Sequence, residues 1–140
     1  MPIAPDLPMP EASAHTRQVA ETAFHAFAQG LATGAWEPFL ALLRDDFQFW
    51  FPAGPFKGWH QGRDTARAFL TQVSLKFPEG LHLDCQQVTS NATTVVFEVR
   101  SHGTVQGQPY ENQAAIAFDI QGDQVCAYRE YLGVIFRFGE

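Results

Sequence analysis

The sequence is poor in charged residues and in cysteine, and each scarcity excludes a class of protein. Charged residues make up 17% of the 140 positions and hydrophobic residues 46%, so the chain can bury a core and intrinsic disorder is excluded. The two cysteines, Cys85 and Cys126, lie far apart and form no C-x-x-C pair. The sequence therefore gives no support for a zinc site or a redox motif, and we expect two buried free thiols.

Basic residues and long hydrophobic runs are scarce as well. Nine Lys and Arg residues stand against 15 Asp and Glu residues, which gives a formal net charge of -6. This sign repels phosphate groups, so nucleic acid is excluded as a partner. No run approaches the ~20 apolar residues of a membrane span, and residues 1–10 lack the basic region and apolar run of a signal peptide. We expect a cytoplasmic protein with no membrane partner.

Common motifs of catalysis and cofactor binding are missing from the sequence. It contains no P-loop, no G-x-G-x-x-G before a helix, no G-x-S-x-G and no H-E-x-x-H. These absences argue against nucleotide cofactors, a hydrolase triad and zincin chemistry, and we expect no cofactor. His82 and Asp84 share one strand face but lack a third ligand, so we expect no metal site.

The residues that are present fit one globular domain behind a short arm. Residues 1–11 carry Pro2, Pro5, Pro8 and Pro10, which prevent a regular helix and predict a loose N-terminal arm. Residues 12–140 have the size of a single domain. The chain has 13 Phe residues, more than a small core needs, and this excess favours an apolar cavity as well as a core.

Helical patterns come first in the domain and strand patterns come last. Val19, Ala23 and Phe27 recur at helical spacing, with Gly30 and Gly34 as stop signals. The patterns predict helices from about residue 12 to these glycines, at 35–43 and at 63–77, a loop at 53–62, and strands at 46–52, 81–89, 93–106, 110–121 and 124–136. Helices followed by consecutive hairpins indicate an antiparallel α+β domain with a curved sheet.

Four short motifs, in this order, carry a family resemblance. They are G-W-H-Q-G-R-D at Gly58–Asp64, G-Q-P-Y-E-N at Gly107–Asn112, G-D-Q-V at Gly122–Val125 and R-E-Y at Arg129–Tyr131. Together they resemble the nuclear transport factor 2-like superfamily, and within it the SnoaL-like proteins related to polyketide cyclases and ketosteroid isomerases. The resemblance spans about residues 12–136.

The resemblance implies a cone-shaped, cystatin-like α+β fold. In such a fold, three N-terminal helices pack on a strongly curved, mostly antiparallel sheet that encloses a pocket, and many members form homodimers through the outer sheet face. Superfamily functions include isomerases, dehydratases, cyclases, epoxide hydrolases and non-catalytic binding modules. Many relatives finish R-E-Y-x-D, whereas this chain has Gly133 in place of that Asp.

Charged and apolar residues alternate along the strand predicted at 93–106. Val95, Phe97 and Val99 share one face, while Glu98 and Arg100 share the other. The charged row is either a solvated outer face or a desolvated pair inside the pocket. In the second case burial would raise the pKa of Glu98 and Arg100 would lower it, so the sequence leaves its protonation state open.

The next strand, at 110–121, changes from polar to apolar along one face. Tyr110 and Asn112 stand at its polar end, and Ala114, Ile116 and Phe118 stand at its apolar end. This gradient suits a strand that runs from the pocket mouth to the core. Asn112 is either the anchor of a hydrogen-bond network or a ligand contact.

The last strand and the loop before the third helix supply the remaining polar candidates. Arg129 and Tyr131 share a face that, by the resemblance, lines the cavity; Tyr131 either donates a hydrogen bond to an oxyanion or only fills space. His60, beside Trp59, is either a general base or a loop histidine that is exposed or bonded to the backbone.

Aromatic side chains are expected to form the apolar wall. Phe49 and Phe51 share one face of the strand at 46–52, and Phe69 lies on the apolar face of the helix at 63–77. They are core residues, pocket walls, or both in one cone. The complete set of candidates is Glu98, His60 and Tyr131 for catalysis, and Asn112, Arg129, Tyr110, Arg100, Trp59, Phe49, Phe51 and Phe69 for ligand binding.

These expectations combine into one functional hypothesis and one alternative. The hypothesis is a cofactor-independent isomerase, cyclase or dehydratase that moves a proton on an apolar, carbonyl-bearing ligand. The alternative is a non-catalytic dimeric ligand-binding or protein-interaction domain. The row of Val95, Phe97 and Val99, if it faces outward, predicts a homodimer through the sheet.

Overall fold

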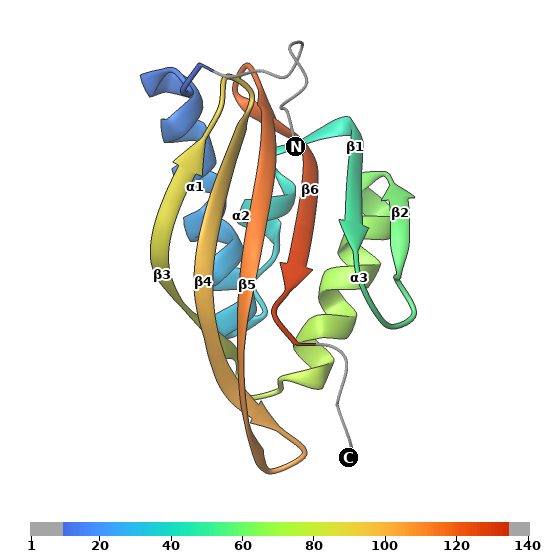
Figure 1. Ribbon diagram of the computed structural model, residues 1–140. Helices are drawn as coiled ribbons and strands as arrows, with labels where there is room; N and C mark the ends of the chain where they lie inside the picture. Colours follow the sequence, from blue (N-terminus) through green and yellow to red (C-terminus); the bar gives the residue numbers. More distant parts are fainter. Residues whose placement is uncertain (1–9, 135–140) are drawn as a thin grey trace.

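The structure, a computed structural model, describes residues 10–134, which form three helices and one six-stranded sheet (Figure 1). The helices are α1 (Ala14–Thr33), α2 (Glu37–Leu40) and α3 (Arg63–Lys76). The strands are β1 (Leu43–Phe51), β2 (Gly58–Gln61), β3 (Leu81–Ser90), β4 (Thr94–Val105), β5 (Gln108–Gln121) and β6 (Gln124–Leu132). Within these residues no helix is long and apolar enough to cross a membrane.

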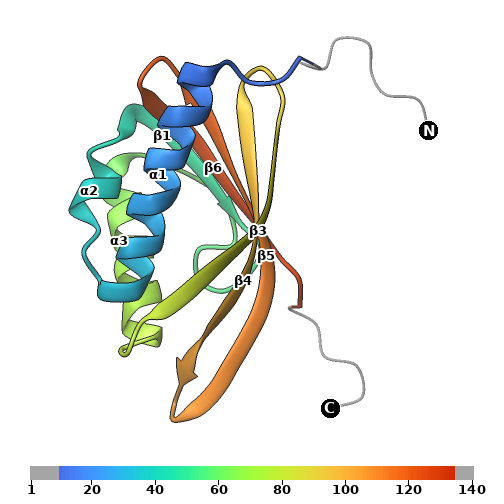
Figure 2. The same ribbon diagram turned by 90° about the vertical axis from the view of Figure 1, so that its left-hand side faces the viewer.

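The sheet has the order β2-β1-β6-β5-β4-β3, and only the β1–β6 pair among these strands is parallel. It is strongly curved and unclosed, and all three helices lie on one of its faces (Figure 2). We call the face toward the helices the inner face and the opposite one the outer face. The predicted α+β class, helices on a curved and mostly antiparallel sheet, is confirmed.

The ends of α1 follow from local chemistry. The Ser13 hydroxyl accepts a hydrogen bond from the Thr16 backbone N–H at 3.1 Å and caps the first turn. Gly34 ends the helix with φ of 83°, a left-handed conformation that favours glycine. Gly30 was expected as a stop signal, and this was wrong because it lies inside the helix. A Cβ there would lie 2.3 Å from Cε3 of Trp36, so Gly30 makes room for that ring.

The loop expected at 53–62 contains a strand instead. Residues Gly58–Gln61 form β2, whose Trp59 pairs with Trp50 of β1 in an antiparallel register. A four-residue strand is too short to show a periodic pattern, so only its pairing with β1 defines it. The last strand ends at Leu132 rather than residue 136, and residues 135–136 of that prediction lie outside the described part.

The core lies between the inner face and the helices and is largely aromatic. Phe27, Phe39, Phe47, Phe49 and Phe118 are each less than 2% exposed. Burial of a side chain of this size stabilises the fold by roughly 1.5–3 kcal/mol. The core therefore accounts for much of the phenylalanine excess.

Val95, Phe97 and Val99 belong to this core. They are 0%, 2% and 2% exposed, and the Phe97 ring stacks on Phe24 of α1 with centroids 4.4 Å apart. The expectation that this row could face outward was wrong, because the helices cover it. The apolar basis of the dimer prediction is thereby removed.

The start of the domain is tied to the far edge of the sheet. The backbone N–H of Ala12 donates to the Ser90 hydroxyl at the end of β3, at 3.2 Å. Residues 1–9 of the predicted arm lie outside the described part of the chain. Of the two cysteines, both free, Cys85 is exposed and Cys126 is half-buried, so the expectation that both are buried was wrong for Cys85.

Candidate functional site

Two polar side chains of β6 point into the helix-covered side of the sheet. Tyr128 lies opposite Phe118 of β5, and Glu130 lies opposite Ile116. Because Phe118 and Ile116 are 0% and 1% exposed, their β6 partners share the buried inner face. Tyr128 itself is 2% exposed, and Glu130 is half-buried.

The expectation that Arg129 and Tyr131 line the interior was therefore wrong, because they occupy the opposite face of β6. Both ends of the Arg129 guanidinium donate to Asp119, at 2.6 Å and 3.0 Å, and hydrogen bonding to Asp119 raises the pKa of Arg129. Tyr131 is 49% exposed, and its ring lies 5.2 Å from that of Trp50. The buried rings that surround Tyr128 favour it, rather than Arg129, on the inner face.

Glu130 and Tyr128 form a hydrogen-bonded pair, in which the Tyr128 hydroxyl donates to Oε1 of Glu130. Burial raises the pKa of Glu130 to about 7, although the hydrogen bond from Tyr128 acts in the opposite direction. Burial, and then the charge of Glu130, raise the pKa of Tyr128 well above its ordinary value. None of the ion pairs formed within residues 10–134 includes Glu130. With this pKa, the Glu130 carboxyl group can exchange a proton near neutral pH.

Aromatic rings fill the interior beyond this pair. The Phe69 ring lies 5.0 Å from that of Phe49 and 4.9 Å from that of Phe51. The remaining cavity has a volume of about 10 Å³, close to the space that one water molecule needs. Its lining residues are Phe27, Phe39, Phe47, Phe49, Ala66, Phe69, Leu70 and Tyr128. Within the described residues, this cavity is too small for an organic ligand.

The gradient predicted along β5 is confirmed. On its inner face Tyr110, Asn112 and Ala114 are half-buried, whereas Ile116 and Phe118 are buried. The strand thus runs from a more open polar end to the closed core, and Glu130 lies at the boundary between the two.

Asn112 anchors a hydrogen-bond network at the open end. Its Nδ2 donates to the Tyr110 hydroxyl at 3.0 Å and to the Val134 carbonyl at 3.4 Å. Its Oδ1 accepts from the backbone N–H of Val134 at 3.2 Å and of Gln113 at 2.8 Å. The Tyr110 ring in turn lies 5.1 Å from that of Phe77. This geometry matches the network-anchor alternative, and a ligand contact by Asn112 remains a prediction.

His60 is bonded to the backbone, as one of the two alternatives required. Its Nε2 lies 2.9 Å from the carbonyl oxygen of Phe56, and its ring stacks on Phe49 with centroids 5.2 Å apart. Its neighbour Trp59 is 57% exposed and points to the outer face opposite Trp50. A general-base role for His60 stays a prediction. It would require a ligand that reaches Nδ1, because Nε2 contacts the Phe56 carbonyl.

Glu98 and Arg100 are exposed on the outer face of β4. Of the two alternatives, the structure thus has the solvated outer face and not the desolvated pair. The helices cover the other face of this strand, so neither side chain shares a space with Phe49 or Phe69.

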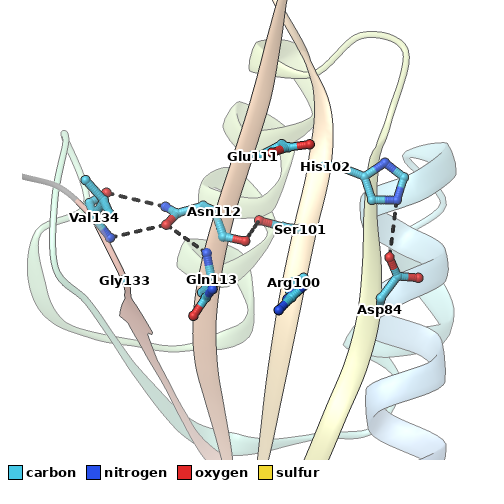
Figure 3. Close-up of a pocket in the computed structure, with 9 residues that line it drawn as sticks. All are labelled: Asp84, Arg100, Ser101, His102, Glu111, Asn112, Gln113, Gly133 and Val134. Carbon is cyan, nitrogen blue, oxygen red and sulfur yellow. Dashed lines mark hydrogen bonds and ion pairs between the residues drawn. The ribbon is translucent and has the colours of Figure 1, made fainter.

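An open groove of about 750 Å³ lies on the outer face. Figure 3 shows the residues that line it, with the helices behind the strands. Its lining residues are Asp84, Arg100, Ser101, His102, Glu111, Asn112, Gln113, Gly133 and Val134. Two candidates from the sequence, Arg100 and Asn112, are among them; Asn112 and its strand partner Ser101 belong by alternation to the inner face and border the groove at its edge. The charges are mixed, and the His102 imidazole lies 3.6 Å from the Asp84 carboxylate.

Within residues 10–134 no cluster of three His, Cys, Asp or Glu side chains is placed to hold a metal ion. The structure instead brings together Tyr128 and Glu130, which the sequence reasoning missed. The available signal was that Glu130 of the R-E-Y motif shares the strand face of Tyr128, two positions before it.

Comparisons with known proteins place this geometry in context. A family model described as a SnoaL-like domain matches residues 24–128. An NTF2-like protein from Anabaena variabilis is 48% identical, with a TM-score of 0.86 over 91% of this chain and 96% of that one. A search of curated proteins found no match.

More distant structures share the fold alone. A proposed SnoaL-like polyketide cyclase from a Jannaschia species is 22% identical, with a TM-score of 0.73 over 87% of this chain and 90% of that one. An LEH-like epoxide hydrolase from M. tuberculosis is 15% identical, with a TM-score of 0.65 over 82% of this chain and 83% of that one. Similar folds thus occur in proteins that are described with different activities.

Proposed function

This chain belongs to the SnoaL-like domain family, and from that premise we propose that it transfers a proton on an apolar, carbonyl-bearing small molecule without a cofactor. The observation that carries the proposal is the Glu130–Tyr128 pair on the inner face of β6. A carboxyl group whose pKa is raised to about 7 is half protonated near neutral pH. It can therefore both accept and return a proton, as general acid–base catalysis requires.

The proposed reaction is an isomerisation that conserves all atoms. The Glu130 carboxylate removes a proton from the carbon between the carbonyl and the double bond of a β,γ-unsaturated ketone. The electron pair moves into a dienolate, and the protonated Glu130 then returns the proton to the γ-carbon. Tyr128 donates a hydrogen bond to the carboxylate and so steadies its orientation between the two transfers. Dehydration and aldol-type cyclisation begin with the same proton removal.

The inner face also limits the size of the ligand. Glu130 lies opposite Ile116, and Asn112 is four residues away along β5, a backbone distance of about 13 Å. Ala114 lies between them, and its small side chain projects little from the inner face and so leaves room for a ligand. A ligand about 10 Å long would reach from the Glu130 carboxyl group to the Tyr110 hydroxyl, which accepts a hydrogen bond from Asn112 and keeps its own hydrogen to donate. A fused-ring ketone has this length and the apolar surface that the half-buried Phe51 and Ala114 would contact.

The alternative, a non-catalytic binding or interaction domain, is favoured by the filled interior. A remaining volume of about 10 Å³ means that a ligand must bind at the open end or displace aromatic rings. A homodimer through the outer sheet face belongs to this alternative and stays a prediction.

Two matched carboxamide variants test the proposal. Glu130→Gln keeps the shape of the half-buried side chain but cannot accept a proton, and Glu98→Gln makes the same change on the outer face. With a β,γ-unsaturated cyclic ketone as the probe, we expect Glu130→Gln to slow conjugation of the double bond by about 10²–10⁴-fold, measured by ultraviolet absorbance. Glu98→Gln should keep the full rate. Loss of activity in Glu98→Gln alone would overturn the assignment, and ketone binding without turnover by the unmodified protein would favour the non-catalytic alternative.

A further inference from the structure

Three aromatic side chains form a strip across the outer face of β2, β1 and β6, away from the proposed proton-transfer site. Trp59 and Trp50 are direct partners in the β1–β2 register. The Trp50 and Tyr131 ring centroids are 5.2 Å apart. Trp50 also pairs with Arg129, and Tyr131 is two residues further along β6, so it lies on the same face as Arg129. All three rings therefore stand on the same side of the sheet. We call Trp59, Trp50 and Tyr131 the aromatic strip.

The aromatic strip is exposed, and it is close to uncharged. Trp59 and Tyr131 are 57% and 49% exposed, among the most exposed large apolar side chains of residues 10–134. The guanidinium of Arg129, the strand partner of Trp50, binds both carboxylate oxygens of Asp119, so its charge is neutralised. Exposed Trp and Tyr clusters of this kind mark binding surfaces. A neutral, apolar and narrow ligand suits this one.

The chain carries a segment of that chemistry in its N-terminal arm. Pro2, Pro5 and Pro8 recur every three residues, which is the period of one turn of a polyproline II helix. The three proline rings would therefore lie along one side of such a helix. Aromatic surfaces recognise Pro-rich segments in this conformation, because little conformational entropy is lost on binding.

The arm begins on the correct side of the sheet. The segment before α1 passes over the turn between β3 and β4 toward the outer side (Figure 2). The hydrogen bond from Ala12 to Ser90 fixes it there. Through the strand registers, Ser90 lies in one row with Val95, Phe118, Tyr128 and Phe49. Trp50 is next to Phe49, so the aromatic strip starts about one residue from the row at which the arm leaves the domain.

The length of the arm matches the width to be crossed. From β3 to β6 there are three strand spacings and from β3 to β2 there are five, which correspond to about 14 Å and 24 Å. Residues 2–10 in a polyproline II helix extend about 28 Å. Successive proline rings would be about 9 Å apart, close to the roughly 10 Å between β6 and β2 that separates Tyr131 from Trp59.

We propose that residues 2–10 bind as a polyproline II segment across the aromatic strip of the same chain. Pro5 and Pro8 would contact the rings, and the arm would cover the outer face of β6, β1 and β2. This contact is independent of the proton-transfer site, which lies on the inner face.

Tryptophan fluorescence of the full chain and of a variant that lacks residues 2–10 tests the proposal. Trp36 is 6% exposed and contributes little to quenching, so acrylamide reports on Trp50 and Trp59. We expect stronger quenching and a red-shifted emission in the shortened chain. A peptide of residues 1–11, titrated into the shortened chain, should restore the protection with saturation.

Matched variants separate the contact from a general effect. Replacing Pro2, Pro5 and Pro8 by Ala in the peptide should abolish the protection. In the shortened chain, Trp59→Ala should abolish peptide binding, measured by calorimetry, whereas Leu75→Ala, which removes a side chain 75% exposed on α3, should not. Equal quenching in the full and shortened chains would overturn the proposal. Protection that grows with protein concentration would also overturn it, since the arm would then bind a second copy.

Discussion

Glu130 shows how one position sets the chemistry of a strand face. Its neighbours Arg129 and Tyr131 point to the outer face, where Arg129 is paired with the carboxylate of Asp119. Glu130 points inward and has the Tyr128 hydroxyl as its hydrogen-bond partner. A carboxyl group in such surroundings is stabilised in the protonated form, because burial penalises its charge.

The raised pKa of Glu130 predicts a pH-dependent stability. The pKa is 4.5 for the free group and about 7 in the folded chain. Between these values the folded chain holds a proton that the unfolded chain has released, so the free energy of unfolding falls as the pH rises. The stabilisation is complete below pH 4.5, and the loss by pH 7 amounts to at most about 3 kcal/mol. Urea unfolding at pH 5 and pH 8 measures it.

Glu130→Gln should remove this dependence, because the amide does not titrate. The variant should lose less stability than the unmodified chain between the two pH values. An unchanged difference in the variant would mean that another group titrates, and the proton-transfer role of Glu130 would lose its basis.

Arg129 gives a second test at the scale of single residues. Arg129→Ala leaves the Asp119 carboxylate, which is 27% exposed, without its bidentate partner. We expect a loss of about 1–3 kcal/mol in the free energy of unfolding. Glu111→Ala, on the exposed outer face of β5, should change it by less than about 0.5 kcal/mol. Equal effects of the two changes in thermal unfolding would contradict a structural role for the Arg129–Asp119 pair.

At the scale of elements, the end of β6 is closed against β5 by backbone contacts. The N–H of Gly133 donates to the Gln113 carbonyl at 2.6 Å, and the Asn112 amide bonds both backbone groups of Val134. A Cβ at position 133 would lie 2.9 Å from the Gln113 carbonyl oxygen and 3.4 Å from Oδ1 of Asn112. Glycine at this position thus permits the close approach of the two segments.

Gly133→Asp, which introduces the residue that the family resemblance leads one to expect there, should therefore be unfavourable in this chain. Both the Cβ contact and the added carboxylate next to two oxygens oppose the Asn112–Val134 bonds. We expect a loss of about 1–3 kcal/mol, the range of an overpacked site, and faster amide exchange at Val134. Gln113→Ala, which changes an exposed side chain nearby, is the control and should have little effect. Gly107→Ala is unsuitable, because a φ of 77° at Gly107 would strain any residue other than glycine. If Gly133→Asp left the free energy of unfolding unchanged, the segment at residues 133–134 would be able to shift away from β5 without cost.

At the scale of the molecule, the outer face of β3, β4 and β5 is polar and carries both signs of charge. Asp84 lies opposite Arg100, and His102 lies opposite Glu111. In a two-fold dimer such a surface meets itself, and opposite charges from the two copies can pair. This arrangement replaces the apolar row as the basis for a homodimer through the sheet.

We expect a dimer in light scattering at micromolar concentration. Arg100→Glu should weaken it, because three acidic groups, with Asp84 and Glu111, would then oppose their copies, and high salt should partly restore it. Leu75→Ala, on the helical side, is the control. A monomer at all accessible concentrations would contradict the prediction.

The class of the fold and the polar-to-apolar direction of β5 could be predicted from the residues alone. Residue spacing defined α1 and α3, turn residues separated the four long strands, and the change from Tyr110 to Phe118 marked the open and closed ends of β5. These features depend on contacts between residues close in the chain, or on burial that repeats with the period of one element.

The tertiary structure alone decided which face of each strand the helices cover. Alternation shows that Glu98 and Arg100 share one face of β4, and that Tyr128 and Glu130 share one face of β6. It does not show whether that face is the inner or the outer one. The packing of α1 on Phe97 and Phe118 decides this. It also decided β2, because four residues become a strand only through hydrogen bonds to β1. A face is chosen by apolar area buried against distant elements, and the local pattern does not contain that information.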